Sequence, residues 1–320
     1  MDEMLALIDR DAALEVPREA AALMNAFLSD RCESTKRAYY ADFKDFSRFL
    51  GIDTPEDAAW VIVARGLRGA NALSLAYKAS MMDRGLSTAT IARRLRALRS
   101  LVKTARFLGL VNWPLEVDVP RLSQFRDTRG PGLIGIRRML DQLDGDGAKD
   151  RRDRAILRLL FDLALRRGEV VSLDMKHLEG LDGEEASIWV RGKGQTERQR
   201  LSLPEPTRRA LLAWLECRGE GPGPVFLNFD KTGKGGRLTG GSVYRIVREL
   251  GEQVGIKTWP HAIRHTAITE AVKKCQESGY PFELACEFSR HRDVRTLLLY
   301  RDRDRDAQGE IAKLVASSML

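Results

Sequence analysis

The stretch from residue 85 to residue 109, GLSTATIARRLRALRSLVKTARFLG, constrains the fold of this chain more than any other part of the sequence. Its hydrophobic residues recur at the 3.6-residue spacing of an α-helix, with Ser87 as a candidate N-cap and Gly109 as a candidate stop. The apolar stripe comprises Ile91, Leu95, Leu98, Val102 and Ala105. A helix with one continuous apolar face has to bury that face against other elements, so the stretch predicts a helical domain.

A basic stripe runs beside the apolar one. Seven Lys or Arg residues and no Asp or Glu lie between residues 84 and 106. Four of them, displaced by one residue or about 100° around the helix, form the stripe, and a weaker copy lies on residues 35–50. The resulting candidates for DNA binding are Arg37, Lys44, Arg96, Arg99, Lys103 and Arg106. A solvated basic face is the alternative, but such faces normally mix charge signs, so we expect contacts with phosphates that set register rather than read bases.

Composition agrees with a nucleic-acid partner. The chain has 320 residues, which favours two domains, and a net charge of +8 with a pI near 9.4, which favours a polyanionic partner. Its four cysteines lack C-x-x-C spacing, which argues against a zinc site or a disulfide framework. No apolar run approaches the ~18 residues of a membrane helix, and the acidic start MDEMLALIDRD does not resemble a signal peptide, so we expect a cytoplasmic protein.

The segment VNWPLEVDVPRLSQFRDTRGPG divides the chain, because three prolines and two glycines without periodicity indicate a linker. We predict an N-terminal domain over residues 1–115, a linker over 116–132 and a second domain over 133–320. Residues 17–113 read as helical throughout, with Pro17 in a first turn, Ser34 as an N-cap and Gly51 as a stop.

The second domain mixes helices with a short hairpin, SIWVRG and RQRLSL on either side of GKGQTE. The predicted fold class is therefore mainly α with a small β-hairpin or sheet. A short amphipathic helix is expected behind the alternating charges of RDRDRD. The other predicted helices span 133–144, 149–165, 205–217, 240–254, 262–276, 282–290 and 293–299.

Candidate chemical groups collect in this second domain. PHAIRHT places His261 and Arg264 three residues apart, on one helix face. ALRRGEV offers Arg166 with Glu169 three residues on, where a carboxylate can hold an arginine's guanidinium in place. Lys193 lies between two glycines at the predicted hairpin tip. Taken singly, each has an ordinary explanation as a surface, ion-paired or helix-surface residue.

The stretch RHRDVRTLLLY adds His291 and Tyr300. A tyrosine behind a leucine run usually packs in a core with its hydroxyl tethered, His291 is also suited to a helix start, and His177 reads as structural. Together, however, the set has a chemistry. Arginines offer forked, permanently charged donors to a phosphate, lysine and histidine carry protons near neutral pH, and tyrosine can bond covalently to phosphorus.

Two common machineries are missing from the sequence. No tight carboxylate cluster suggests a two-metal site, and GKGQ lacks the hydroxyl and the upstream glycine of a nucleotide-binding loop. The inventory therefore suits phosphoryl transfer through a protein-linked intermediate, without a metal, ATP or another cofactor.

The order R…K…H-x-x-R…H…Y resembles that of the tyrosine recombinase (phage integrase) family. ALRRGEVVSL, VRGKGQTERQRLSL, PHAIRHT and RHRDVRTLLLY resemble the family's active-site boxes, and residues 85–114 resemble the last helix of its N-terminal, core-binding domain. One departure is that Ser289 and Arg290 stand where the family usually has Leu-Gly. The resemblance implies the catalytic set Arg166, Lys193, His261, Arg264, His291 and Tyr300, with Glu169 behind the first arginine.

The resemblance also implies a mechanism. The two domains would clamp duplex DNA, and Tyr300 would attack the scissile phosphate to give a 3′-phosphotyrosine and a free 5′-hydroxyl. Arg166 and Arg264 would stabilise the developing charge, and Lys193 would protonate the leaving oxygen. The histidines would have separate tasks: His261 would help move the tyrosine proton, and His291 would hydrogen-bond a non-bridging oxygen.

Family members exchange strands as tetramers through a Holliday junction. The terminal helix, with Ile311, Leu314 and Val315, is a candidate for docking on a neighbouring subunit, and packing on its own domain is the alternative. Two other functions stay open at this point. A type IB topoisomerase uses the same residues on one duplex, and a DNA-binding regulatory factor would have lost catalysis.

Overall fold

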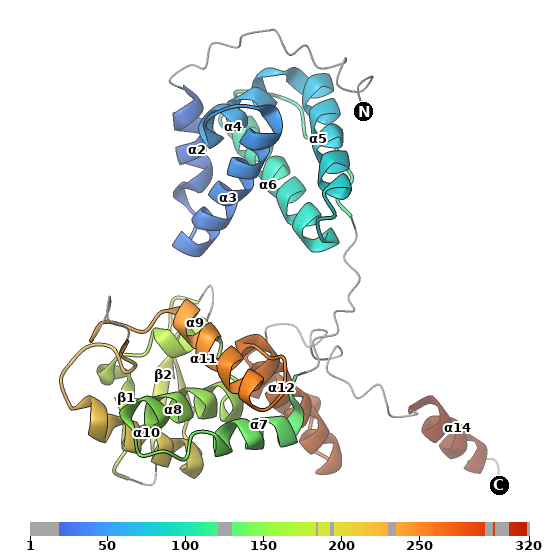
Figure 1. The fold of residues 1–320 in the computed structure, drawn as a ribbon. Coiled ribbons are helices and arrows are strands. Elements are labelled where there is room, and N and C mark those ends of the chain that lie inside the picture. The colour runs from blue at the N-terminus through green and yellow to red at the C-terminus, as the bar shows by residue number, and fades with distance from the viewer. Residues whose placement is uncertain are drawn as a thin grey trace. The chain divides into compact units, whose positions relative to one another are not determined.

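The computed structural model describes residues 19–120, 130–183, 185–192, 195–229, 235–291, 297 and 307–318. They are mainly α-helical with one small antiparallel sheet, which confirms the predicted fold class (Figure 1). The chain divides into two compact units, Met1–Gln124 and Phe125–Leu320, which are described separately below. The DNA-binding and catalytic roles assigned to the two predicted domains remain predictions.

The first unit is a bundle of helices around one hydrophobic core. The predicted apolar stripe of residues 91–105 is buried within it, together with Phe43, Phe46 and Tyr77. The neighbouring face of this helix, which carries Arg96, Arg99, Lys103 and Arg106, is exposed to solvent. The helices are α2 (Glu19–Ser29), α3 (Glu33–Leu50), α4 (Pro55–Ala64), α5 (Gly66–Asp83) and α6 (Thr88–Phe107).

Most predicted helix ends in this unit are confirmed. The Ser87 hydroxyl accepts a hydrogen bond from the Thr90 amide at 3.3 Å and so caps α6, and Gly51 ends α3 in the left-handed conformation with φ 69°. The prediction for Ser34 was wrong, because α3 begins at Glu33 behind Cys32, which has extended backbone. Pro17 lies outside the described residues.

The second unit surrounds α8, which packs against α10 and α12. The predicted hairpin is confirmed as β2 and β3, paired in the register Ile188 opposite Leu201, and a two-residue strand, β1, adds a third member that was not predicted. Its helices are α7 (Gly132–Asp141), α8 (Ala148–Asp162), α9 (Arg167–Val171), α10 (Glu205–Arg218), α11 (Gly240–Gln253), α12 (Pro260–Glu277), α13 (Phe282–Ser289) and α14 (Ala307–Ser317). Its strands are β1 (Leu178–Glu179), β2 (Ser187–Val190) and β3 (Gln199–Ser202).

The predicted helix over 149–165 was wrong at its end. Helix α8 stops at Asp162, and Ala164 adopts a left-handed φ of 46°. Leu163 and Leu165 remain buried in the core, so the apolar pattern continues although the helix does not. Such a conformation is uncommon for a residue with a side chain and is held by its surroundings. The resulting turn directs the Ala164 carbonyl to two arginines, as described below.

Gly130 packs directly against α12, the helix of the H-x-x-R box. A Cβ atom at this position would lie 1.9 Å from the Thr266 hydroxyl and 2.3 Å from the Ala262 carbonyl oxygen. Only glycine permits this approach. The segment that leads into α7 is therefore held against α12 within one turn of His261 and Arg264.

A small hydrophobic cluster lies beside the main core of this unit. Leu297 is fully buried in it with Ala164 and with side chains of α12 and α13. The rest of the predicted helix 293–299 lies outside the described residues.

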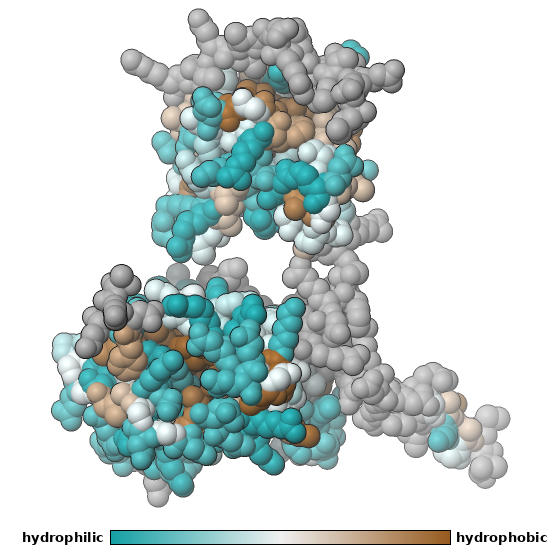
Figure 2. Space-filling view, viewed as in Figure 1, coloured by the Kyte–Doolittle hydropathy of each residue, from teal (hydrophilic) through white to brown (hydrophobic). Residues whose placement is uncertain are grey.

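The face of the second unit drawn in Figure 2 is largely hydrophilic, with smaller hydrophobic areas between.

Two further predictions concern the chain as a whole. All four cysteines are free thiols, in agreement with the reduced thiols expected from their spacing. Within the described ranges, no helix has the length and apolar character needed to span a bilayer.

His177, read as structural, is buried, and its Nδ1 accepts a hydrogen bond from the Asp174 amide at 2.9 Å.

Candidate active site

Arg166 and Glu169 form a unit at the start of α9. One oxygen of the Glu169 carboxylate accepts from the Arg166 guanidinium at 2.8 Å, and the other accepts from the Arg166 backbone amide at 2.8 Å. Glu169 is buried, whereas about a third of the Arg166 side chain is exposed. The carboxylate therefore caps the helix and at the same time fixes the direction of a guanidinium that opens to solvent.

Backbone carbonyl groups fix the position of the Arg264 side chain. Its side chain is 1% exposed, and its guanidinium donates to the carbonyl oxygens of Ala164 and Ser289. Ala164 lies two residues before Arg166, and Ser289 two residues before His291. Arg264 thus joins the three segments that carry the first arginine, the H-x-x-R box and the last histidine.

Arg290 closes the network and was not among the predicted site residues. Its guanidinium donates to the Ala164 carbonyl at 2.9 Å and to the Glu169 carboxylate at 3.0 Å. Arg166 and Arg264 are thereby connected through Glu169, Arg290 and the Ala164 carbonyl oxygen. The two predicted arginines meet at one place instead of opening onto separate surfaces.

The pKa values of the two predicted histidines are lowered by burial and by the charges of both arginines. The pKa of His291 is lowered to about 4, first by burial and then by the positive charges of Arg264 and Arg166. The pKa of His261 is also lowered, first by partial burial and then by the same two guanidinium groups, although the residue as a whole is exposed. Both imidazoles are therefore neutral at pH 7, and each can offer one donor and one acceptor nitrogen.

Lys193 and Tyr300 lie outside the described residues. The assignment of Lys193 and Tyr300 as catalytic residues remains a prediction.

The six predicted DNA-binding residues of the first unit are all exposed. Part of the basic series is used internally, because Arg84 and Arg94 bind Asp45 and Arg93 binds Asp42. Among the described residues, no carboxylate pairs with any of the six candidates. The structure thus separates the arginines that tie α3 to α6 and to the end of α5 from the basic residues that face outward.

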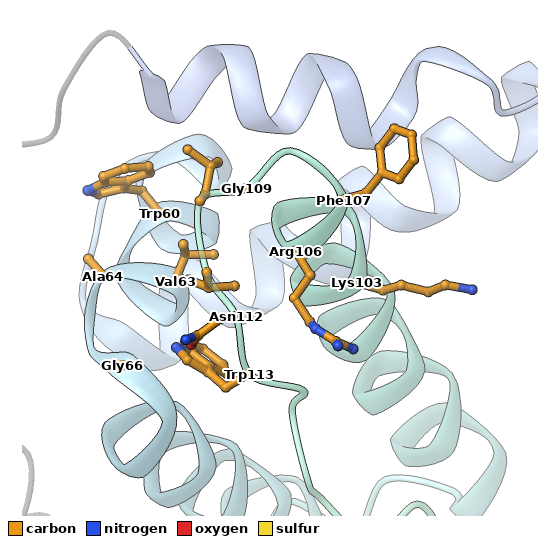
Figure 3. A pocket seen from close by; sticks show the side chains of 12 residues that line it. Trp60, Val63, Ala64, Gly66, Lys103, Arg106, Phe107, Gly109, Asn112 and Trp113 are labelled. Atoms are coloured by element: carbon orange, nitrogen blue, oxygen red, sulfur yellow. The ribbon is translucent and has the colours of Figure 1, made fainter.

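The first unit also has an open hollow of about 1010 Å³ between α4 and the end of α6. Figure 3 shows Trp60 and Trp113 on one side of it and the side chains of Lys103 and Arg106 extending from α6. Its lining contains no histidine, cysteine or carboxylate. The hollow therefore carries no candidate chemistry of its own, unlike the arginine network of the second unit.

Comparison with known proteins identifies the family of this chain. Residues 135–306 match the model of the phage integrase family. A tyrosine recombinase of Synechococcus elongatus is 36% identical, with 99% of each chain covered, and one of Synechocystis is 32% identical, with 89% of this chain and 91% of the relative covered. Among solved structures, the Tn1549 transposon integrase in complex with transposon right end DNA has a TM-score of 0.64 at 16% identity, covering 92% of this chain and 99% of its own, which supports the fold alone.

These matches span the described network from α7 to beyond α13, and the chain belongs to the phage integrase family. It is accordingly a tyrosine recombinase, an enzyme of site-specific recombination.

Two contributors to the site were missed by sequence reasoning. Arg290 was noted only as a departure from the family pattern, although an arginine in place of a glycine was the available signal. The Ala164 carbonyl had no signal, since alanine inside an apolar run predicts a helix interior.

Proposed function

We propose that the protein cleaves and rejoins duplex DNA at specific sites through a 3′-phosphotyrosine formed by Tyr300. The observation that carries this proposal is the joint anchoring of Arg166 and Arg264 on Glu169, Arg290 and the Ala164 carbonyl. Two fixed guanidiniums at one place provide the forked donors that a phosphate needs as its charge rises in the transition state.

In the proposed step, the phenolic oxygen of Tyr300 attacks phosphorus while the bond to the 5′-oxygen breaks. Lys193 gives its proton to that leaving oxygen, and the tyrosine proton passes to His261. A free phenol has a pKa near 10, and the neutral state of His261 that follows from its lowered pKa suits this acceptance. His291, also neutral, donates to a non-bridging oxygen.

The phosphotyrosine linkage conserves the energy of the broken phosphodiester bond. A 5′-hydroxyl from another duplex can therefore attack the linkage without ATP or a metal. Two such exchanges would pass through a Holliday junction, with four subunits on two sites. Relatives in the solved structures include a lambda integrase dimer bound to a core site. Helix α14 is our candidate for contact between subunits, because its Val315 side chain is 61% exposed.

The first unit would supply much of the affinity for DNA. Its outward-facing basic residues lie on α3 and α6 without carboxylate partners among the described residues, so they are available to phosphates. Together with the second unit, this surface would enclose the duplex as a clamp. Because the proposed substrate is duplex DNA, we place the protein in the cytoplasm with that DNA.

The test is covalent trapping on a nicked suicide substrate. Tyr300→Phe should abolish the protein–DNA adduct and leave DNA affinity near that of the unaltered protein, because only the nucleophilic oxygen is removed. Tyr280→Phe is the matched control, since Tyr280 is an exposed tyrosine close to the final boxes, and it should form adduct normally. Adduct that persists with Phe at position 300 would overturn the assignment, and relaxation of plasmids regardless of sequence, without strand exchange, would overturn the specificity.

A further inference from the structure

Arg290 occupies a backbone position suited to glycine. It follows the last residue of α13 with φ 54° and ψ 38°, the left-handed conformation that commonly ends helices. Glycine adopts this conformation freely, whereas residues with a side chain seldom do. Favourable contacts of the Arg290 side chain can offset the cost of this conformation.

The Arg290 side chain is buried and makes four hydrogen bonds. Nη1 donates to the carbonyl oxygens of Leu163 at 2.9 Å and Phe288 at 3.3 Å, and Nη2 donates to the Ala164 carbonyl at 2.9 Å and to Glu169 at 3.0 Å. Its side chain is 5% exposed and that of Glu169 is 4% exposed. A charge this deeply buried requires a partner of opposite sign with good geometry, and Glu169 provides it.

The same contacts reach the anchors of both predicted catalytic arginines. Glu169 binds Arg290 through Oε2 and the Arg166 guanidinium through Oε1. The Ala164 carbonyl accepts from both Arg290 and Arg264. Arg290 therefore restricts the carboxylate that orients Arg166 and the carbonyl that orients Arg264.

Arg290 also changes the charge available to a bound anion. With Arg166 alone, the negative charge of Glu169 would be matched by a single guanidinium. Arg290 is a second partner that neutralises the negative charge of Glu169 from the buried side. The positive charge of Arg166 then remains available to an anion on the solvent-facing side of its guanidinium.

We propose that Arg290 is a positioning residue that holds Arg166 and Arg264 in the orientation required for phosphate cleavage, a task that a glycine at this position has no side chain to perform. This inference rests on the proposed function above. It differs from a purely conformational role, in which Arg290 would only end α13.

Arg290→Gly separates these roles, because glycine suits φ 54° better than arginine while removing the guanidinium. In single-turnover cleavage of a nicked suicide substrate by the full chain at saturating protein, we expect the rate to fall about 100-fold, as for a small misplacement of reacting groups. The dissociation constant for the DNA should change less than about threefold, since few phosphate contacts are affected. Arg290→Lys, which keeps the charge and loses the fork, should recover part of the lost rate.

A double-mutant cycle with Glu169→Gln provides the second readout. If Arg290 acts through Glu169, the loss caused by Arg290→Gly should shrink from about 100-fold to about tenfold in the Glu169→Gln background. Thermal melting of each variant verifies that it is folded. A cleavage rate for Arg290→Gly equal to or above that of the unaltered protein, or losses that multiply independently in the double variant, would overturn the inference. Absence of any adduct with the unaltered protein would instead overturn the proposed function.

Discussion

In the first unit, arginines reach from the surface to carboxylates that are buried, whereas in the site network of the second unit two of the arginines are themselves buried. Asp42 is 3% exposed beneath Arg93, whose side chain is 46% exposed. Arg264 and Arg290, by contrast, are almost completely enclosed. The carboxylates are buried in both networks, so the two differ in the depth of their arginines.

This difference in the depth of the arginines distinguishes a structural tie from a site. A buried carboxylate under partly exposed arginines fastens helices together, as Asp45 does by accepting from Arg84, Arg94 and the Tyr77 hydroxyl. Buried guanidiniums beneath a partly exposed one concentrate positive charge toward the exposed side of Arg166, where an anion would be stabilised. The comparison teaches that charge alone does not identify a binding site, whereas the depth of the charge and the identity of its partners do.

The largest expected effect comes from the most deeply buried arginine. Arg264→Lys keeps the charge but loses the fork that donates to Ala164 and Ser289, so cleavage of a nicked suicide substrate should fall about 1,000-fold. DNA binding measured on the same variant should change little. A cleavage rate within tenfold of the unaltered protein would remove the distinction between the two networks.

The corresponding change in the first unit should affect stability instead of chemistry. Asp45→Asn removes a charge that binds Arg84 and Arg94, and we expect a loss of about 3 kcal/mol in the free energy of unfolding of this unit. Hydrogen exchange should report faster opening of α3, α5 and α6, with α8 and α12 unchanged. Asp83→Asn, at an exposed carboxylate of α5, is the control and should exchange normally.

The outward-facing stripe should contribute to affinity through phosphates. Arg99→Ala should weaken DNA binding about tenfold at low salt, equally for specific and unrelated sequences. The slope of the logarithm of the binding constant against the logarithm of the salt concentration should fall by about one, which corresponds to one fewer released ion. Lys36→Ala is the control, because Lys36 already pairs with Glu33 at 2.9 Å on α3. Equal salt slopes for both variants, measured by titration at several salt concentrations, would show that the stripe is only a solvated face.

The smallest effect concerns acid stability. The pKa of His291 falls from 6.5 to about 4 on folding, so between these values the unfolded chain binds more protons and stability decreases as the pH falls. His291→Gln should remove part of this decrease, by less than about 3 kcal/mol because solvent reaches the partly exposed ring. Urea unfolding of both proteins at pH 7, 5.5 and 4.5 measures it. Identical pH dependence would exclude His291 as a contributor.

Much of the fold was predictable because local signals were strong. Ser87 and Gly51 lie at helix ends as their residue types require, and the apolar stripe of α6 is buried. The end of α8 was not predictable, because Leu163 and Leu165 are buried on either side of the turn and extend the helical pattern. The two-residue strand β1 is too short to carry a periodicity of its own.

The site was predictable as a set of residues but not as a network. Sequence order brought out Arg166, His261, Arg264 and His291, and the structure brings these four together. The carboxylates that occupy Arg84, Arg93 and Arg94 lie about 40 to 50 residues away on α3, so sequence alone did not separate paired from outward-facing arginines. Three of the four hydrogen-bond partners of the Arg290 side chain lie 121 to 127 residues away.

The left-handed turn at Ala164 restricts how this enzyme can vary. Glycine or asparagine would tolerate φ 46°, but valine, isoleucine or threonine would be driven back toward extended or helical backbone and would rotate the carbonyl away. A saturation library at this codon, selected for recombination, should therefore retain small residues and reject branched ones. A buried position without a role in the chemical step would thus still limit which side chains the enzyme accepts.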